Sequence, residues 1–100
     1  MDVNRALRSA TQSGKVGLGV NETLKAVTAK QAKLIVLSSN APSEAVDQVT
    51  KLATKNKVPI YKFAGTNAEL GPACGKPFSV SMLSVLEAGE SDVLALAREG

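Results

Sequence analysis

Histidine and tryptophan are absent from this chain of 100 residues, and cysteine occurs once, at Cys74. Without histidine the chain has no Ser-His or Cys-His catalytic pair, and no imidazole to bind a metal ion. A single cysteine allows neither an internal disulfide nor a cysteine-based zinc site. These absences predict a protein that is not an enzyme and that holds no metal ion or other cofactor.

Long apolar runs are also missing. The longest, Leu-Ile-Val-Leu at 34–37, is far too short to span a bilayer, and the polar start MDVNRALRSATQ lacks the apolar stretch of a secretory signal. We therefore expect a cytoplasmic protein with no membrane association. Only three aromatic residues are present, so aliphatic side chains must fill the core of a single domain, residues 1–100.

The charged residues are unevenly spread along the chain, although the net charge is only +3. Residues 1–62 carry ten Lys or Arg against four acidic residues, and residues 63–100 carry two against five. This distribution indicates that one side of the molecule favours a polyanion. An ordinary solvated charged surface is an equally good explanation of the charge alone.

Helical and strand patterns alternate along the chain. Helices are predicted after Asp2, after the glycine turn at 17–19, after Ser43 as N-cap, after a Thr66–Glu69 capping box, and over 93–97. Strands are predicted over 15–18, 33–38, 58–63 and 78–86. Such alternation is typical of a sheet with helices on both faces. The expected fold is a three-layer α/β/α sandwich with a central mixed sheet of about four strands.

The stretch GLGVNETLKAV at 17–27 has three possible explanations. A dinucleotide fingerprint G-x-G-x-x-G fails at its third position, where Glu22 would bring negative charge towards a pyrophosphate. In a structural explanation, Asn21 caps the helix and Glu22 complements the helix dipole. That explanation leaves out Lys25, which follows one helical turn later on the same side.

Recognition of RNA accounts for all of these residues together. The Glu22 carboxylate accepts hydrogen bonds from guanine N–H groups, the Asn21 amide both donates and accepts, and Lys25 reaches base acceptors or a phosphate. Gly19 lets the backbone approach without a side chain, and the helix start offers N–H groups to phosphate oxygens. This pattern favours exposed base edges, as RNA presents at bulges, loops and non-Watson–Crick pairs.

Five segments carry a family resemblance: GVNETLKAV, AKLIVLSSNAP, NKVPIYKF, ELGPACGKPFSV and VLEAGESDVLAL. Together, from about residue 3 to 97, they resemble the kink-turn RNA-binding superfamily, and within it the L thirty e branch of archaeal and eukaryotic large-subunit ribosomal proteins. N-E-x-x-K is similar to the wider superfamily, and ELG…GKPF with EAGESD to the ribosomal branch. Asn21 departs from the basic residue common in that branch, and Asn-Glu is commoner in snoRNP-type relatives.

The resemblance implies a non-enzymatic protein that binds and stabilises a sharply bent RNA. It implies that the RNA contacts fall on Gly19, Asn21, Glu22, Lys25, Asn40, Phe78 and Val80. The group at the helix start would read tandem sheared G·A pairs, and Phe78 and Val80 would pack on bases near the internal loop. The implied partners are RNA with a kink-turn, in the first place ribosomal RNA, and neighbouring ribosomal proteins, with a monomer when free. A guide-RNA core protein and a protein-interaction or stress-scaffold domain of the same fold stay open as alternatives.

Several of these positions also have plain structural explanations. Asn40 suits a turn before Ala41-Pro42, Phe78 suits the start of a buried strand, and Val80 is typical of a core. Cys74 is predicted to be an inert buried side chain. The lysines at 51, 55 and 57 are predicted to form a solvated face rather than a second RNA site.

Overall fold

The computed structural model describes residues 2–98, with side chains described for residues 2–97. Its elements come in the order that the sequence predicts: α1 (Val3–Ser13), β1 (Lys15–Leu18), α2 (Val20–Thr28), β2 (Leu34–Leu37), α3 (Ser43–Lys55), β3 (Ile60–Lys62), α4 (Asn67–Ala73), β4 (Met82–Glu87) and the 3-10 helix η1 (Val93–Arg98).

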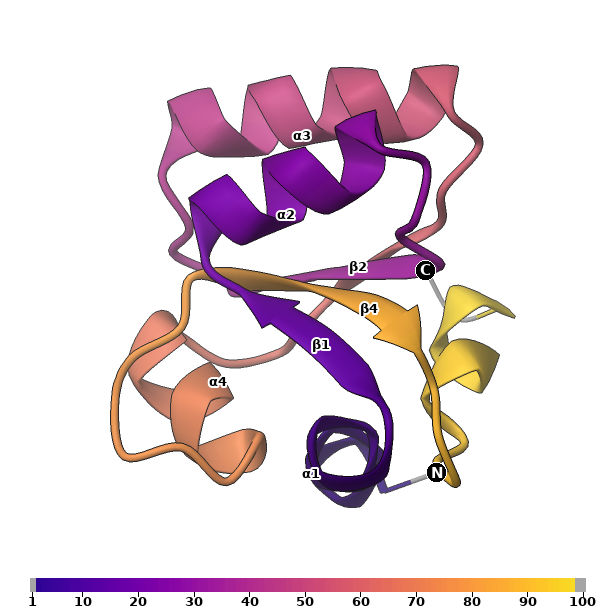
Figure 1. The fold of residues 1–100 in the computed structure, drawn as a ribbon. Coiled ribbons are helices and arrows are strands. Elements are labelled where there is room, and N and C mark those ends of the chain that lie inside the picture. Colours follow the sequence, from indigo (N-terminus) through magenta and orange to yellow (C-terminus); the bar gives the residue numbers. More distant parts are fainter. Residues whose placement is uncertain (1, 99–100) are drawn as a thin grey trace.

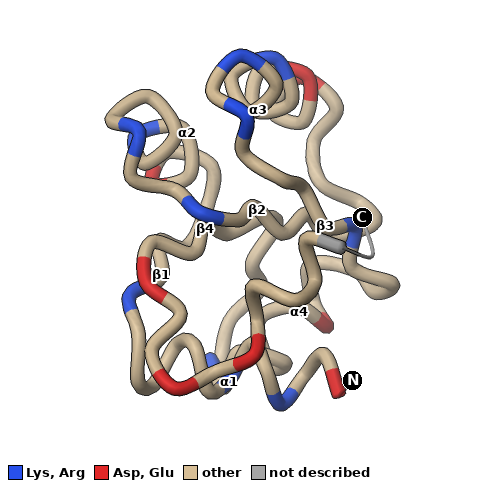
Figure 2. The backbone as a smooth tube through the Cα atoms, turned by 90° about the vertical axis from the view of Figure 1, so that its right-hand side faces the viewer, with Lys and Arg blue, Asp and Glu red and all other residues tan. Residues whose placement is uncertain are grey.

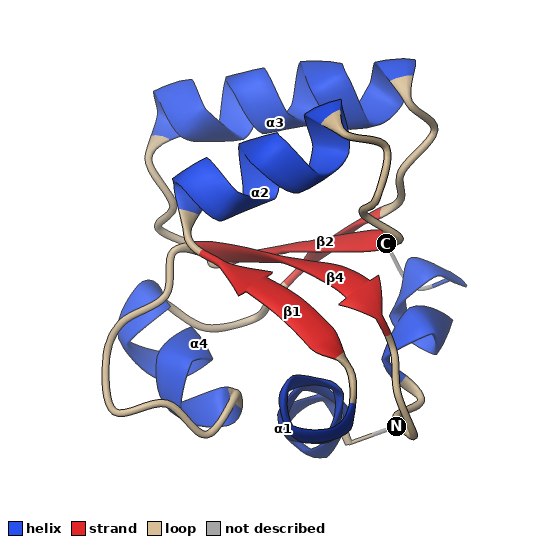
Figure 3. Cartoon of the chain, viewed as in Figure 1, coloured by secondary structure: helices blue, strands red, loops and turns tan. Residues whose placement is uncertain are grey.

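Within residues 2–98, four strands form one sheet in the order β1-β4-β2-β3. β4 lies between β1 and β2 and is antiparallel to both, whereas β2 and β3 are parallel. Helices α2 and α3 cover one face of the sheet, and α1, α4 and η1 cover the other (Figure 1). Figure 3 shows the strands as a single layer between these two sets of helices. The predicted three-layer sandwich with a mixed sheet is confirmed.

The strand β2 runs through the centre of the core, and all four of its side chains are buried. Leu34 and Val36 pack with the helices on one face, while Ile35 and Leu37 pack with α2 and α3 on the other. This alternation follows from the two-residue period of a strand, and it explains why the run is apolar throughout. Among the described residues, no helix has the length and apolar character needed to cross a bilayer.

Some element boundaries differ from the sequence predictions. β4 begins at Met82 and not at residue 78, because the N–H of Val80 donates to the carbonyl oxygen of Asn67 (3.0 Å) and ties this segment to the start of α4. β3 is limited to Ile60–Lys62, and the last helix is a 3-10 helix. The prediction of Ser43 as N-cap is wrong. Pro42 has the extended ψ of 130° and occupies the capping position, so Ser43 is already the first helical residue.

Candidate nucleic-acid interface

The start of α2 is set by Gly19, which occupies the N-cap position with a φ of +94°. Its N–H donates to the carbonyl oxygen of Met82 (2.8 Å), and its own carbonyl accepts from the N–H of Thr23 (3.0 Å). A left-handed φ of this kind favours glycine, which has no Cβ to clash. The start of α2 has no side-chain cap: Gly19 offers none, and no side chain bonds to the first N–H groups as a cap. The structural explanation in which Asn21 caps the helix is therefore wrong, because Gly19 is the N-cap and Asn21 is already the second residue of α2.

Asn21, Glu22 and Lys25 lie exposed in the first turns of α2. Because residues three and four apart share one side of a helix, the carboxylate, the amide and the ammonium group are offered to solvent together. The first N–H groups of the helix lack partners within it, so they add donors at the same place. Gly17 lets this turn sit close to β1: a Cβ there would lie 3.2 Å from the Cβ of Glu22.

Asn40 follows β2 and joins two loops. Its amide nitrogen donates to the side-chain oxygen of Asn67 (2.9 Å), and its amide oxygen accepts from the backbone N–H of Asn67 (2.7 Å). Asn40 remains exposed, and its amide NH₂ group has a second hydrogen to donate. The residue is thus both a turn residue and an exposed polar group. Sequence reasoning missed Asn67, because the capping box at 66–69 identifies a helix start but not a link to another loop.

Phe78 lies on the loop between α4 and β4 and is 52% exposed, so it does not begin a buried strand. The loop is held against α4 by a close approach. A Cβ added to Gly71 would come 1.7 Å from the carbonyl oxygen of Phe78, a position that only glycine leaves open. The N–H of Lys76 also donates to the carbonyl oxygen of Gly71 (3.0 Å). A large aromatic side chain is therefore presented to solvent from a fixed loop.

Val80, at the end of the same loop, lies in the core with 3% of its surface exposed. Its side chain packs with the buried residues beneath α4, which agrees with its plain structural explanation. Its backbone N–H bonds to the carbonyl oxygen of Asn67. The position of Val80 is therefore that of an anchor beneath the loop that carries Phe78, while Phe78 faces solvent.

The three segments meet at one edge of the sheet. In the strand register Leu18 lies opposite Leu83, and Leu37 lies opposite Met82, so β1 and β2 end where β4 begins. The start of α2, the Asn40 loop and the loop before β4 therefore leave the sheet side by side, at the left of Figure 1. Residues separated by some sixty positions in the sequence form one surface, which we call the loop edge.

The match of this chain to a protein-family model extends over residues 1–95, and the description of that family is "Ribosomal protein L7Ae/L30e/S12e/Gadd45 family". The chain belongs to this family. The archaeal protein "Large ribosomal subunit protein eL30" of Methanospirillum hungatei JF-1 is 45% identical over 98 residues, which cover 98% of this chain and 100% of that protein.

Two further archaeal relatives of the family have the same name. The eL30 proteins of Methanosarcina mazei and Methanocaldococcus jannaschii are each 41% identical to this chain. The alignments cover 95% and 99% of this chain, and 88% and 90% of the relatives. These relatives are named as ribosomal proteins and not as enzymes, which agrees with the sequence prediction of a non-enzymatic protein.

A solved structure supports the fold of this family member. A protein of unknown function from Bacillus halodurans superposes with a TM-score of 0.83 at 26% sequence identity. The superposition covers 97% of this chain and 96% of that one. The two proteins thus share one fold over almost the whole of this chain.

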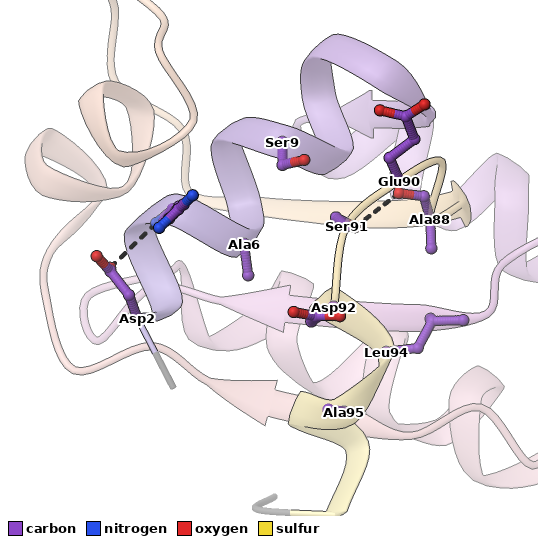
Figure 4. Close-up of a pocket in the computed structure, with 10 residues that line it drawn as sticks. Asp2, Ala6, Ser9, Ala88, Glu90, Ser91, Asp92, Leu94 and Ala95 are labelled. Carbon is purple, nitrogen blue, oxygen red and sulfur yellow. Dashed lines mark hydrogen bonds between the residues drawn. The ribbon is translucent and has the colours of Figure 1, made fainter.

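A hollow lies at the other end of the sheet from the loop edge. It has a volume of about 890 Å³, and its walls are α1 and the segment 88–95 (Figure 4). Asp2, Glu90 and Asp92 line it, against the single base Arg5. Its acidic lining disfavours a polyanion. The loop edge and this acidic hollow therefore occupy different parts of the molecule.

Two buried polar groups have no role in the loop edge. Cys74 is buried, as predicted, and burial raises the pKa of its thiol above the ordinary value, although hydrogen bonding to Thr11 and the charge of Lys76 act in the other direction. The hydroxyl of Thr23 is fully buried in α2 without a hydrogen-bond partner among the described residues. No group of three or more possible metal ligands occurs among those residues.

Proposed function

We propose that this chain is a component of the large ribosomal subunit in the cytoplasm. In this role it binds a kink-turn or similar asymmetric internal loop of ribosomal RNA and stabilises its bent form. The names of the archaeal relatives support the ribosomal part of this proposal. The RNA motif is supported by the loop edge itself and by the family resemblance of its residues.

The observation that carries the proposal is the mixture of groups at the loop edge. Glu22 and Asn21 are exposed beside Lys25 at a helix start, and Phe78 is exposed on a loop that leaves the same edge. A site that bound phosphate by charge alone would gain nothing from a carboxylate. A carboxylate is useful where guanine N–H groups must be recognised, and an exposed aromatic ring is useful where a base must be stacked.

In the proposed complex each residue has a distinct role. Glu22 and Asn21 bond to the edges of sheared G·A pairs, Lys25 bonds to base acceptors or a phosphate, and Gly19 admits the RNA backbone close to the turn. Asn40 holds the neighbouring loop and donates its second amide hydrogen. Phe78 stacks on a base of the internal loop, and Val80 anchors that loop from below.

The mechanism is selection of one RNA shape. A ligand shifts a conformational equilibrium only by its differential affinity for the two states. The base edges and the unstacked base are accessible together only in the bent RNA, so a protein that contacts both favours that form. The loop edge is built on strand ends, on the backbone hydrogen bond from Gly19 to Met82 and on the close approach of Gly71 to the Phe78 carbonyl oxygen, which makes it a rigid template.

The test compares two RNAs that differ only at the G·A pairs. Replacing tandem G·A pairs next to a three-nucleotide bulge with Watson–Crick pairs leaves the phosphate number almost unchanged, so the counterion-release term is nearly preserved. We expect a loss of affinity of at least a hundredfold, or about 2.7 kcal/mol, in a gel-shift comparison at one salt concentration. Equal affinity for both RNAs would mean that the protein recognises only charge, and the proposal would fail.

The acidic hollow at the opposite end of the sheet supports a second part of the proposal, that the chain also contacts neighbouring ribosomal proteins. Its lining of Asp2, Glu90 and Asp92 is complementary to a basic segment of a neighbouring ribosomal protein. Such a partner would approach from the side that the RNA leaves uncovered. RNA binding by the protein alone does not require this partner. We further propose that the free protein is a monomer.

A further inference from the structure

Two lysines have a backbone conformation that side chains rarely adopt. Among residues 2–98, Lys30 with a φ of +59° and Lys57 with a φ of +57° are the non-glycine residues with positive φ. Each one directly follows the end of a helix on the same face of the sheet: Lys30 lies beyond α2, and Lys57 lies beyond α3.

Both lysines occupy the same position of the same motif. After α2, the N–H of Lys30 donates to the carbonyl oxygen of Val27 (3.0 Å), and that of Gln31 donates to Ala26 (2.9 Å). After α3, the corresponding bonds run from Lys57 to Thr54 (3.3 Å) and from Val58 to Ala53 (2.8 Å). These are two Schellman motifs, in which the left-handed position is usually glycine. Both helices thus have a lysine where the backbone alone would favour glycine.

The two strained lysines line one hollow. It has a volume of about 280 Å³, and its other lining residues are Ala32, Lys55, Asn56 and Val58. Three of the six lining residues are lysines, and none is acidic. Figure 2 looks at this end of the molecule and shows several basic segments on α2 and α3, in the upper part of the view. We call this surface the lysine hollow.

Stabilisation of the helix ends does not require these two lysines. A cation near a helix C-terminus interacts favourably with the helix dipole. However, Lys25 already lies in the last turn of α2, and Lys55 in the last turn of α3. A residue other than glycine in this left-handed conformation is strained, and such strain is typical of functional sites. The repulsion among three lysines around one hollow would be relieved by an anion.

We expect the lysine hollow to suit an extended anion better than a single phosphate. Packed helices lie about 8–10 Å apart, and the hollow joins the ends of two of them. A nucleic-acid duplex carries one charge per about 1.7 Å of its axis, so a span of that length faces several phosphates. Lysine binds phosphate as a point charge on a flexible stem, without the fixed geometry that recognises one group.

We propose that the lysine hollow is a second RNA-binding site, which holds the phosphate backbone of a duplex segment without reading its sequence. This proposal replaces the solvated face that the sequence alone predicts for Lys55 and Lys57, because the hollow brings both together with Lys30. The site is separated from the loop edge by the length of α2, about 13 Å for its nine residues. The two sites would therefore engage different parts of an RNA, and the protein would hold them at a fixed distance. The proposal does not depend on what the loop edge recognises.

The test uses two charge-matched triple variants and a fully paired RNA duplex without an internal loop. The first variant is Lys30→Gln, Lys55→Gln, Lys57→Gln, and the control is Arg8→Gln, Lys15→Gln, Lys62→Gln, three exposed basic residues outside the hollow. We expect the first variant to bind the duplex at least tenfold more weakly than the control. The slope of log affinity against log salt should fall by about 2–3, the value for three lost phosphate contacts. Equal losses in both variants would overturn the proposal, because only net charge would then matter.

A second variant separates binding from folding. In Lys30→Gly, Lys57→Gly the strained positions receive the residue that suits them, so we expect an unchanged or higher melting temperature together with weaker duplex binding. Duplex binding at the level of the unchanged protein would overturn the proposal. Binding to polyglutamate is measured as well. The proposal would also be overturned if the Lys30→Gln, Lys55→Gln, Lys57→Gln variant still bound the duplex but had lost binding to polyglutamate, since the hollow would then suit an acidic protein segment.

Discussion

Replacing Glu22 with alanine tests the sign of its contribution to RNA binding. Glu22 lies exposed in the first turn of α2, at the loop edge where the RNA is proposed to bind. By electrostatic repulsion alone, removing a carboxylate near RNA should tighten binding. If Glu22 instead accepts hydrogen bonds from base edges, its removal should weaken binding by about 1–3 kcal/mol, or roughly 5- to 150-fold. The two mechanisms thus predict changes of opposite direction.

The fold should tolerate this change. Glu22 forms no side-chain cap, and its favourable interaction with the helix dipole is worth about 0.3–1 kcal/mol. Alanine has a high helix propensity, which offsets part of that loss. We therefore expect the free energy of unfolding to change by less than about 1 kcal/mol.

Glu44 provides a matched control, because it is an exposed glutamate in the first turn of the neighbouring helix α3. The assay is fluorescence anisotropy with one kink-turn RNA at a single salt concentration, together with thermal melting of each variant. Glu44→Ala should bind as well as the unchanged protein or slightly better, whereas Glu22→Ala should bind more weakly. Tighter binding by Glu22→Ala, or the same change in both variants, would refute base-edge recognition.

Three substitutions and one chemical reaction test further features. Phe78→Ala should weaken kink-turn RNA binding by about 1–3 kcal/mol and leave urea unfolding nearly unchanged, because the ring is largely exposed; a large loss of stability instead would make Phe78 a packing residue. Gly71→Ala should lower the free energy of unfolding by more than about 2 kcal/mol, since the new Cβ would clash with the carbonyl oxygen of Phe78. Thr23→Val should raise it by about 1 kcal/mol by removing an unpaired buried hydroxyl; a decrease would show that the hydroxyl has a partner. Because its pKa is raised, Cys74 holds less thiolate at pH 8 than a free thiol, so a thiol reagent should react with it at the full rate only after unfolding.

The parts of the fold that depend on local pattern could be predicted from the sequence. The run at 34–37 is apolar because β2 is covered on both faces, and that pattern survives in any register. The Thr66–Glu69 capping box forms as expected, with the N–H of Thr66 donating to the Glu69 carboxylate (3.0 Å). Such signals depend on residues that are neighbours in the chain.

Two features that the sequence did not predict depend on contacts between distant segments. Gly19 can end its turn without a side-chain cap because its N–H bonds to Met82, sixty-three positions away. The exposure of Phe78 depends on the close approach of its carbonyl oxygen to Gly71. The loop edge was therefore predictable as a set of residue types, but its geometry was not, because sheet order and loop contacts bring the residues together.

The sheet order has a consequence for how the protein is made. β4 is the last strand in the chain, yet it lies between β1 and β2 and is the partner that joins them. A nascent chain that has not yet been extended through Glu87 has β1 with no neighbouring strand and β2 with an open edge. Open strand edges pair readily with other chains. Folding of the sheet must therefore wait until synthesis has passed β4, and a chain interrupted before Met82 should depend on chaperones to stay unaggregated.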